Sequence, residues 1–382
     1  VWNLKMKEKD DYKDDLNCHG EWVNYLASLP LDKGKVTEYQ GMNVPIDLAL
    51  ALHSDAGVRE GDSIVGTLGI YATGKKEKIF SNGRSRMTSR DMTDIIQTEI
   101  IEDIRRVYNE DWTRRAMWDR GYSEALRPGV PTMLLELFSH QNLNDVIYAQ
   151  DPGFLFTVSR AVYKGILKYL SFEFNLDYVV QPLPVEHFAT TIKENGSVYL
   201  SWEPVMDSLE PTAKPEGYIV YQRINDAGFD NGTLVKQKYL EISGLSMDSI
   251  YSFKVCAYNR GGKSFPSEVL SLCRNSASDN QVLIVNAFDR TGGAAWFKDS
   301  LYSGFLDMKD QGVPYMQDTY TTGYQYDFDR NSEWLDDDSP GHGASYADHE
   351  TSIIPGNTFD YSYIHGISVR NAGYSFVSVS DE

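Results

Sequence analysis

The chain has 382 residues and a formal net charge of −19 at pH 7, from 55 Asp and Glu against 36 Lys and Arg. This length favours two or three domains, because single cores stop growing beyond roughly 250–300 residues. The acidic charge argues against a nucleic-acid-binding protein, since neutralising phosphates requires Lys and Arg. No apolar run approaches the roughly 20 residues that cross a bilayer. The chain begins with Val1, so we expect a fragment whose targeting segment is not part of it.

Strands and helices are expected to alternate in residues 1–172. Residues 46–52 ("IDLALAL") and 131–138 ("PTMLLELF") are short apolar runs bounded by polar or turn residues, which is typical of buried strands. Residues 88–108 carry apolar side chains at helical spacing, and residues 152–170 form a second amphipathic helix that begins with a proline. This alternation predicts an α/β domain with a mainly parallel sheet.

Two residues capable of chemistry accompany the predicted strands. His53 follows the first strand, and Glu136 lies inside the second, within "LLEL". Ligands of open α/β sheets bind beyond the carboxyl ends of the strands, so both side chains are expected to reach one crevice. An imidazole can bind zinc, and a carboxylate beside zinc-bound water can move its proton. One His and one Glu are also compatible with side chains satisfied by local hydrogen bonds.

Residues 130–170 resemble the C-terminal signature of zinc-dependent N-acetylmuramoyl-L-alanine amidases of the amidase-3 type. In that family a strand of the form "PAVLVE" carries the catalytic glutamate, an Asn-x-x-Asp/Glu turn follows, and a helix ends in "GI". The matching positions here are Pro131, Glu136, Ser139, Asn142, Asp145 and Gly165–Ile166. The segment "IDLALALHSDAG" likewise resembles the family's "DLFISIHANA".

The resemblance covers about residues 20–172 and implies hydrolysis of the amide between N-acetylmuramic acid and L-Ala. It implies Glu136 as general base and His53 as a zinc ligand. The family's first ligands, a His in a Gly-rich turn and a Glu on the next helix, have no counterpart before His53. His19 and Glu21 lie in a segment that aligns better with a later helix of the family. We therefore expect zinc in the complete protein and an incomplete zinc site here, with the N-terminal part of the domain missing.

Other side chains near these strands are candidates for substrate binding. His140 follows Glu136 by four residues, and Arg84 and Arg86 lie in a loop between the two strands. The arginines could bind an acidic stem peptide or a uronate, although a solvated loop is the simpler explanation.

The sequence pattern changes after residue 172. Residues 173–184 hold two prolines and predict a linker, and residues 185–275 contain alternating strands separated by turns, which is typical of a β-sandwich. The latter segment resembles a fibronectin type III domain, with Trp202 at the core position and Tyr251 at the anchoring tyrosine. Cys256 and Cys273 lie on its last two strands, where a disulfide is one alternative and two free thiols the other.

Residues 276–382 are expected to form an incomplete α/β segment. Residues 280–290 ("NQVLIVNAFDR") open with a buried strand, and residues 376–380 form a final strand. The whole arrangement resembles large secreted bacterial proteins labelled xanthan lyase.

The sequence therefore predicts a multidomain extracytoplasmic protein, periplasmic, surface-bound or secreted, that acts on peptidoglycan or another cell-surface glycan. Zinc-dependent amide hydrolysis is the first hypothesis. The alternatives are a polysaccharide lyase of the xanthan type and a non-catalytic glycan-binding or scaffold protein with a degenerate amidase domain. No nucleic-acid partner and no transmembrane segment are expected.

Overall fold

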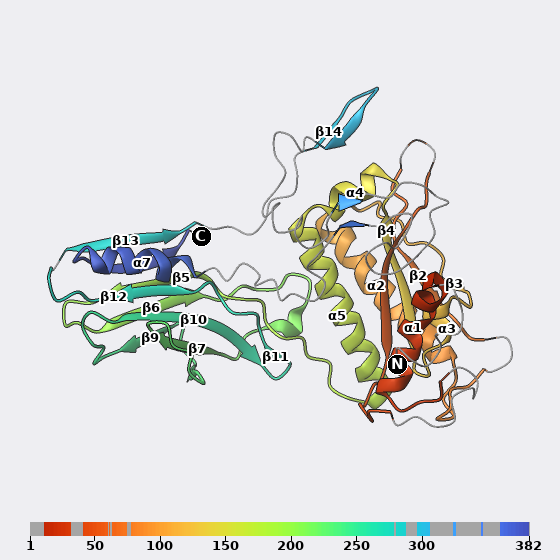
Figure 1. Ribbon diagram of the computed structural model, residues 1–382, viewed down its shortest axis with the longest axis horizontal. Helices are drawn as coiled ribbons and strands as arrows, with labels where there is room; N and C mark the ends of the chain where they lie inside the picture. Colours follow the sequence, from red (N-terminus) through yellow and green to blue (C-terminus); the bar gives the residue numbers. More distant parts are fainter. Residues whose placement is uncertain are drawn as a thin grey trace. The chain divides into compact units, whose positions relative to one another are not determined.

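The computed structural model of the chain contains two compact units (Figure 1). The first comprises Val1–Leu176 and Arg290–Ile354, and the second comprises Asp177–Asp289 and Pro355–Glu382. The structure describes residues 11–31, 41–59, 61, 63–74, 78–278, 280–287, 296–305, 324–325, 345–346 and 360–381. In these ranges no helix is both long and apolar enough to cross a membrane.

A four-stranded mixed sheet forms the centre of the first unit. Its strands are β1 (Ala49–Asp55), β2 (Leu68–Tyr71), β3 (Trp118–Asp119) and β4 (Thr132–Ser139), in the order β1-β4-β2-β3. β1 runs parallel to β4, whereas β2 runs antiparallel to it. The strands predicted at 46–52 and 131–138 are confirmed as β1 and β4. β1 continues three residues further than predicted and therefore includes His53.

Helices cover both faces of this sheet (Figure 1). α2 (Met87–Val107) and α5 (Pro152–Phe174) pack on one face, against Met133 and Leu135 of β4. α3 (Ser123–Leu126) packs on the other face, against Leu134. α1 (Asp11–Leu26) lies against α3, and α4 (Leu143–Ala149) follows β4. The two long predicted helices are confirmed as α2 and α5.

A buried ion pair joins α2 to α5. Lys164 of α5 is 1% exposed, and its Nζ lies 2.6 Å from Oδ2 of Asp103, which is 3% exposed on α2. The next residue, Gly165, allows the helices to approach closely, because a Cβ there would lie 2.7 Å from the Cα of Ile96. The "GI" pair of the amidase-like signature thus lies at a helix crossing.

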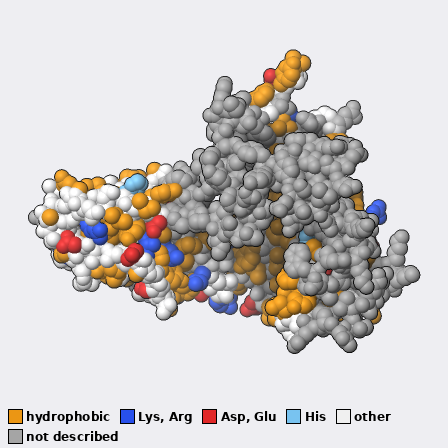
Figure 2. Space-filling model, in the orientation of Figure 1, with side chains coloured by type: hydrophobic (Ala, Val, Ile, Leu, Met, Phe, Trp, Pro, Cys, Tyr) orange, Lys and Arg blue, Asp and Glu red, His pale blue; other side chains and the backbone are white. Residues whose placement is uncertain are grey.

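The second unit contains an all-β fold. Its strands are β5 (Glu186–Ile192), β6 (Val198–Glu203), β7 (Gly217–Ile224), β8 (Thr233–Val235), β9 (Tyr239–Ile242), β10 (Ile250–Asn259), β11 (Gly262–Lys263) and β12 (Leu270–Cys273), with a short 3-10 helix, η3 (Pro211–Ala213). Trp202 is 1% exposed in its core, as predicted. The hydroxyl of Tyr251 accepts a hydrogen bond from Ser246 N at 2.9 Å. On the face shown in Figure 2, the described acidic and basic side chains of this unit are interspersed.

The sulfurs of Cys256 and Cys273 are not bonded to each other. The register between β10 and β12 pairs Cys273 with Ile250, which is six residues from Cys256 along the strand. Strand geometry places residues six apart roughly 20 Å from each other, too far for a disulfide. The disulfide alternative is therefore wrong, and both thiols are free.

The end of the chain adds a parallel strand pair to this unit. β18 (Ser375–Ser380) pairs in parallel with β13 (Gln281–Asn286), and α7 (Tyr361–Asn371) packs on both. β18 also forms single bridges to β12 and β5. These two strands confirm those expected at 280–290 and 376–380, while the extent of a separate segment over 276–382 stays a prediction. The remaining described strands are β14 (Trp296–Lys298), β15 (Ser303–Phe305), β16 (Tyr324–Gln325) and β17 (Ser345–Tyr346), which pair as β14-β15 and β16-β17.

Candidate functional site

The parallel pairing of β1 and β4 places His53 and Glu136 side by side. The two residues are direct Cα partners in the ladder, as are Ala51 and Leu134 two residues earlier. Paired residues, and residues two apart on a strand, point to the same face of a sheet. Because Leu134 packs against α3, His53 and Glu136 belong to the face opposite α2 and α5. The sequence prediction that these two residues meet at one edge of the sheet therefore agrees with the register.

Glu136 is a partly buried carboxylate, and one of its oxygens has no hydrogen-bond partner among the residues that the structure describes. Its Oε2 is buried and accepts no hydrogen bond among the described residues. Burial raises the pKa of Glu136, and the neighbouring carboxylate of Asp55 raises this pKa further. The imidazoles of His53 and His140 and the positive charge of Arg115 oppose this shift without cancelling it. A carboxyl group in this setting holds a proton more tightly than an exposed glutamate does.

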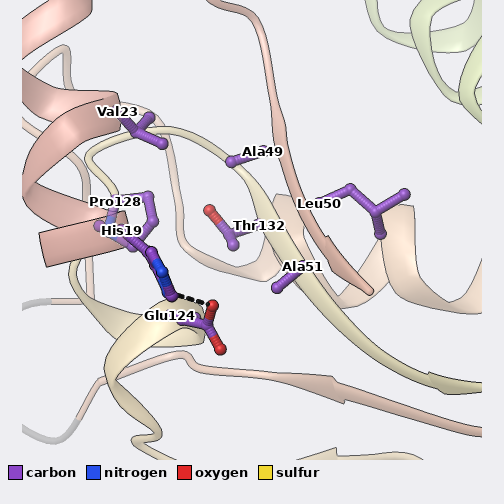
Figure 3. Close-up of a pocket in the computed structure, with 9 residues that line it drawn as sticks. His19, Val23, Ala49, Leu50, Ala51, Glu124, Pro128 and Thr132 are labelled. Atoms are coloured by element: carbon purple, nitrogen blue, oxygen red, sulfur yellow. Dashed lines mark hydrogen bonds and ion pairs between the residues drawn. The ribbon is translucent and has the colours of Figure 1, made fainter. Parts of the chain in front are cut away.

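Glu124 of α3 connects His53 to α1 by hydrogen bonds. Nε2 of His53 lies 2.7 Å from Glu124 Oε2, and Nδ1 of His19 lies 2.8 Å from Oε1 of the same carboxylate. Figure 3 shows the His19 ring and the Glu124 carboxylate facing each other at a pocket of about 250 Å³. Val23 of α1 and Ala49 of β1 supply part of its apolar lining.

The described residues do not form the zinc site that the resemblance implies. A catalytic zinc takes three protein ligands and keeps one position open. Within the described part of the chain, no three His, Cys, Asp or Glu side chains are arranged to hold a metal ion. His19 and His53 instead contact different oxygens of the Glu124 carboxylate.

The three substrate-binding candidates have different environments. His140 is exposed near Glu136, and its Nδ1 lies 3.2 Å from the Ser54 hydroxyl. Arg84 instead pairs with Glu173 of α5 at 2.8 Å. Arg86 is 8% exposed and donates to the carbonyl of Leu126 at 3.2 Å. His140 therefore lies near Glu136, as expected. The contacts of Arg84 and Arg86 do not support a role for these two residues beside Glu136.

A second charged pair adjoins Glu136 on the same side of the sheet. The Arg115 guanidinium forms an ion pair with the carboxylate of Asp55, two residues after His53. The same guanidinium lies 5.6 Å from the ring centroid of Trp118. Sequence reasoning missed Arg115, Trp118 and Glu124, since each reaches the site through contacts that have no local sequence pattern.

The Asn-x-x-Asp turn of the signature fixes the end of β4. The carboxylate of Asp145 accepts hydrogen bonds from the backbone N–H groups of Val65 at 3.0 Å, Gly66 at 3.0 Å and Ser139 at 2.9 Å. Asn142 caps α4 by accepting from Asp145 N at 3.1 Å. The turn thus ties the end of the strand that carries Glu136 to the segment before β2.

Replacing Asp145 by asparagine is expected to destabilise the first unit by about 1–3 kcal/mol, because an NH₂ group would face backbone donors that lose their acceptor. Urea unfolding followed by circular dichroism measures the change. Asp91→Asn on the exposed side of α2 is the matched control and should stay within about 0.5 kcal/mol. Equal stability of the two variants would contradict this role for Asp145.

Comparison with known proteins identifies the β-sandwich segment. The model of the fibronectin type III domain matches residues 184–272, which confirms the domain expected at 185–275. Among curated proteins none matches the chain. Solved structures similar to it include the twitchin kinase region from C. elegans, at 23% identity over 24% of this chain and 16% of that chain, with a TM-score of 0.21. The FN5 domain of Drosophila Lar is 20% identical over 24% of this chain and 96% of its own, with a TM-score of 0.20.

An amidase is also among the similar structures. The N-acetylmuramoyl-L-alanine amidase AmiC2 of Nostoc punctiforme is 14% identical over 32% of this chain, with a TM-score of 0.26. The match spans 58% of that amidase chain. The likeness is distant and carries no argument about activity. Residues 184–272 of this chain are a fibronectin type III domain that accompanies an N-terminal α/β domain with a mixed sheet.

Proposed function

We propose that the N-terminal α/β domain hydrolyses the amide bond between N-acetylmuramic acid and L-Ala in peptidoglycan, with Glu136 as the proton-transferring residue. The observation that carries the proposal is the carboxylate of Glu136. It is partly buried, one of its oxygens accepts no hydrogen bond within the described part of the chain, and it lies beside His53 near the carboxyl ends of two parallel strands. The resemblance of the sequence around Glu136 to amidases of the amidase-3 type suggests the substrate class.

The proposed chemistry uses the raised pKa of Glu136. Amide hydrolysis needs a base that takes a proton from the attacking water and an acid that returns it to the leaving amine. A carboxyl group whose pKa is above that of an ordinary glutamate can perform both steps in turn. The positive guanidinium of Arg115 near Glu136 would favour negative charge that develops on the carbonyl oxygen.

The proposal also concerns the setting of the protein. Peptidoglycan lies outside the cytoplasm, so an extracytoplasmic location follows from the substrate. The fibronectin type III domain would space the α/β domain from other parts of the protein or from the wall. Zinc, which the resemblance implies with His53 as one ligand, would need further donors besides His53.

The experiment is the digestion of purified peptidoglycan by the whole chain, with mass spectrometry of the released material. Free stem peptides beginning with L-Ala are the expected product, and they should be absent with Glu136→Gln. Parallel reactions with a chelator and with added zinc show whether the activity needs the metal. Absence of stem peptides in all of these reactions would overturn the proposal. Unsaturated uronate products from an acidic polysaccharide would indicate a lyase, and glycan binding without products would indicate a scaffold.

A further inference from the structure

Trp118 is an exposed tryptophan on the sheet face that carries Glu136. It is 40% exposed, whereas Trp112 and Trp202 are at most 1% exposed within the hydrophobic cores. The strand register shows on which face of the sheet Trp118 lies. Trp118 of β3 pairs with Ile70 of β2, which in turn pairs with Leu134 of β4. Paired residues share a face, so Trp118 lies on the face of Leu134 and Glu136.

Side-chain contacts connect the Trp118 ring to the candidate site. Arg115 lies over the ring at 5.6 Å and forms an ion pair with Asp55. Both members of that pair act on the charge of Glu136. Arg115 thus contacts the Trp118 ring and also acts on the pKa of Glu136.

An arginine lies beside Trp118, and a second exposed aromatic residue follows it in the sequence. The guanidinium of Arg120 lies 6.0 Å from the ring centroid. Tyr122, which is 47% exposed, follows at the start of α3, and α3 carries Glu124. Residues 118–124 thus lead from the exposed indole to the carboxylate that contacts His53.

We infer that Trp118 and Arg120 form a sugar-binding subsite, on which a pyranose ring of the glycan strand stacks while the amide bond reaches Glu136. This inference rests on the proposed function for the identity of the polymer. The C–H face of a pyranose is apolar and weakly positive, so it packs on the negative face of an indole. The guanidinium of Arg120 donates hydrogen bonds to the sugar's hydroxyl or carboxylate oxygens at the edge of the ring. A mixed apolar and charged surface of this kind fits a sugar better than it fits an aliphatic side chain.

The test is binding of two separate probes by calorimetry: glycan strands stripped of stem peptides, and free stem peptide. The Glu136→Gln background excludes turnover. Trp118→Ala should weaken glycan binding about 3- to 10-fold, which corresponds to the usual contribution of an aromatic stacking contact. Trp118→Phe should recover most of the affinity, and Arg120→Gln should weaken binding as well. Stem-peptide binding should be the same in all variants.

In the protein with Glu136 intact, the kinetics of Trp118→Ala distinguish an effect on substrate binding from an effect on the chemical step. Trp118→Ala should raise KM for peptidoglycan by a similar factor and leave kcat within about twofold. Unchanged glycan affinity in Trp118→Ala, or no binding of glycan strands by the parent protein, would overturn the inference. Trp118-dependent glycan binding without any release of stem peptides would sustain the subsite and overturn the proposed hydrolysis, so the two failures are distinguishable. Thermal unfolding of each variant confirms that the domain is intact.

Discussion

Replacing Glu136 by glutamine is expected to lower the rate of stem-peptide release by roughly 10²–10⁴-fold, the usual contribution of a positioned general acid or base. Glutamine preserves the shape of the side chain and its neighbours, but it cannot accept a proton from water. The rate constant is measured by quantifying released peptides at saturating peptidoglycan. A variant that retains more than a tenth of the parent rate would show that another group moves the proton.

Two other residues serve as comparisons for that result. Glu124→Gln removes a charge at the His53 contact and leaves Glu136 in place. Its expected loss is smaller than that of Glu136→Gln, because Glu124 acts through His53. His140→Ala should have the smallest effect of the three, since its side chain is exposed and contacts Ser54. A larger loss in Glu124→Gln than in Glu136→Gln would place the chemistry on His53.

Glu136→Gln should lower the reaction rate but raise the stability of the folded protein at neutral pH. The pKa of Glu136 in the folded protein lies above its ordinary value of 4.5, so the folded state binds this proton more tightly than the unfolded state does. The parent protein therefore loses stability, relative to Glu136→Gln, as the pH rises from below 4.5 through the folded pKa. The two proteins should unfold alike near pH ~4, and the variant should be the more stable at neutral pH.

The raised pKa of Glu136 also determines how activity depends on pH on the acidic side. The carboxylate form of Glu136 is the base, and its pKa is raised mainly by burial. The value of kcat/KM should therefore rise with pH around a midpoint above 4.5, the ordinary value for a glutamate. A midpoint at or below that value would indicate that the group responsible is more exposed than Glu136.

Replacing Asp103 by alanine is expected to destabilise the first unit by about 3–5 kcal/mol, because it leaves a buried ammonium group without its main partner. Lys164 is 1% exposed, and the pair distance is 2.6 Å. Glu99 Oε2 lies 3.9 Å from the same Nζ, so the loss should fall toward the lower end of the range. Urea unfolding followed by far-ultraviolet circular dichroism, which reports mainly on helices such as α2 and α5, measures it.

Matched variants separate lost charge from lost packing. The double replacement Asp103→Leu with Lys164→Met should recover most of the stability, because it removes both charges of the buried pair and leaves Glu99 paired with Lys168. Arg90→Ala serves as the surface control. Its ion pair with Asp91 on α2 joins side chains that are 41% and 49% exposed, so its loss should cost about 0–1 kcal/mol. A loss in Asp103→Ala no larger than in Arg90→Ala would contradict the importance of the buried pair.

The elements that sequence predicted correctly are those with a local signal. The apolar runs around Leu50 and Leu134 mark strands, and the helical spacing of Ile96 and Ile100 marks α2. His53 and Glu136 could be placed together because parallel strands bring matching ends to one edge of a sheet. Trp202 identified the core of the fibronectin type III domain because its position within an alternating strand is distinctive.

The residues that sequence could not place depend on contacts between distant segments. Glu124 lies 71 residues from His53 along the chain, on a helix of four residues that gives no periodic pattern. Arg84 was expected near the substrate from its place between two strands, but its partner Glu173 is on α5. Charged side chains reach far and choose among several partners, so chain position alone does not determine where their end groups lie.

The bridging carboxylate of Glu124 determines the tautomer of two histidines. An ionised carboxylate only accepts hydrogen bonds, so Nε2 of His53 and Nδ1 of His19 must both carry hydrogen. In its neutral form His53 therefore keeps its lone pair on Nδ1, while His19 keeps its own on Nε2. An electrophile or a proton donor that engages His53 in this arrangement must approach from the Nδ1 side of the ring. The ring nitrogens thus have fixed directions before any substrate arrives.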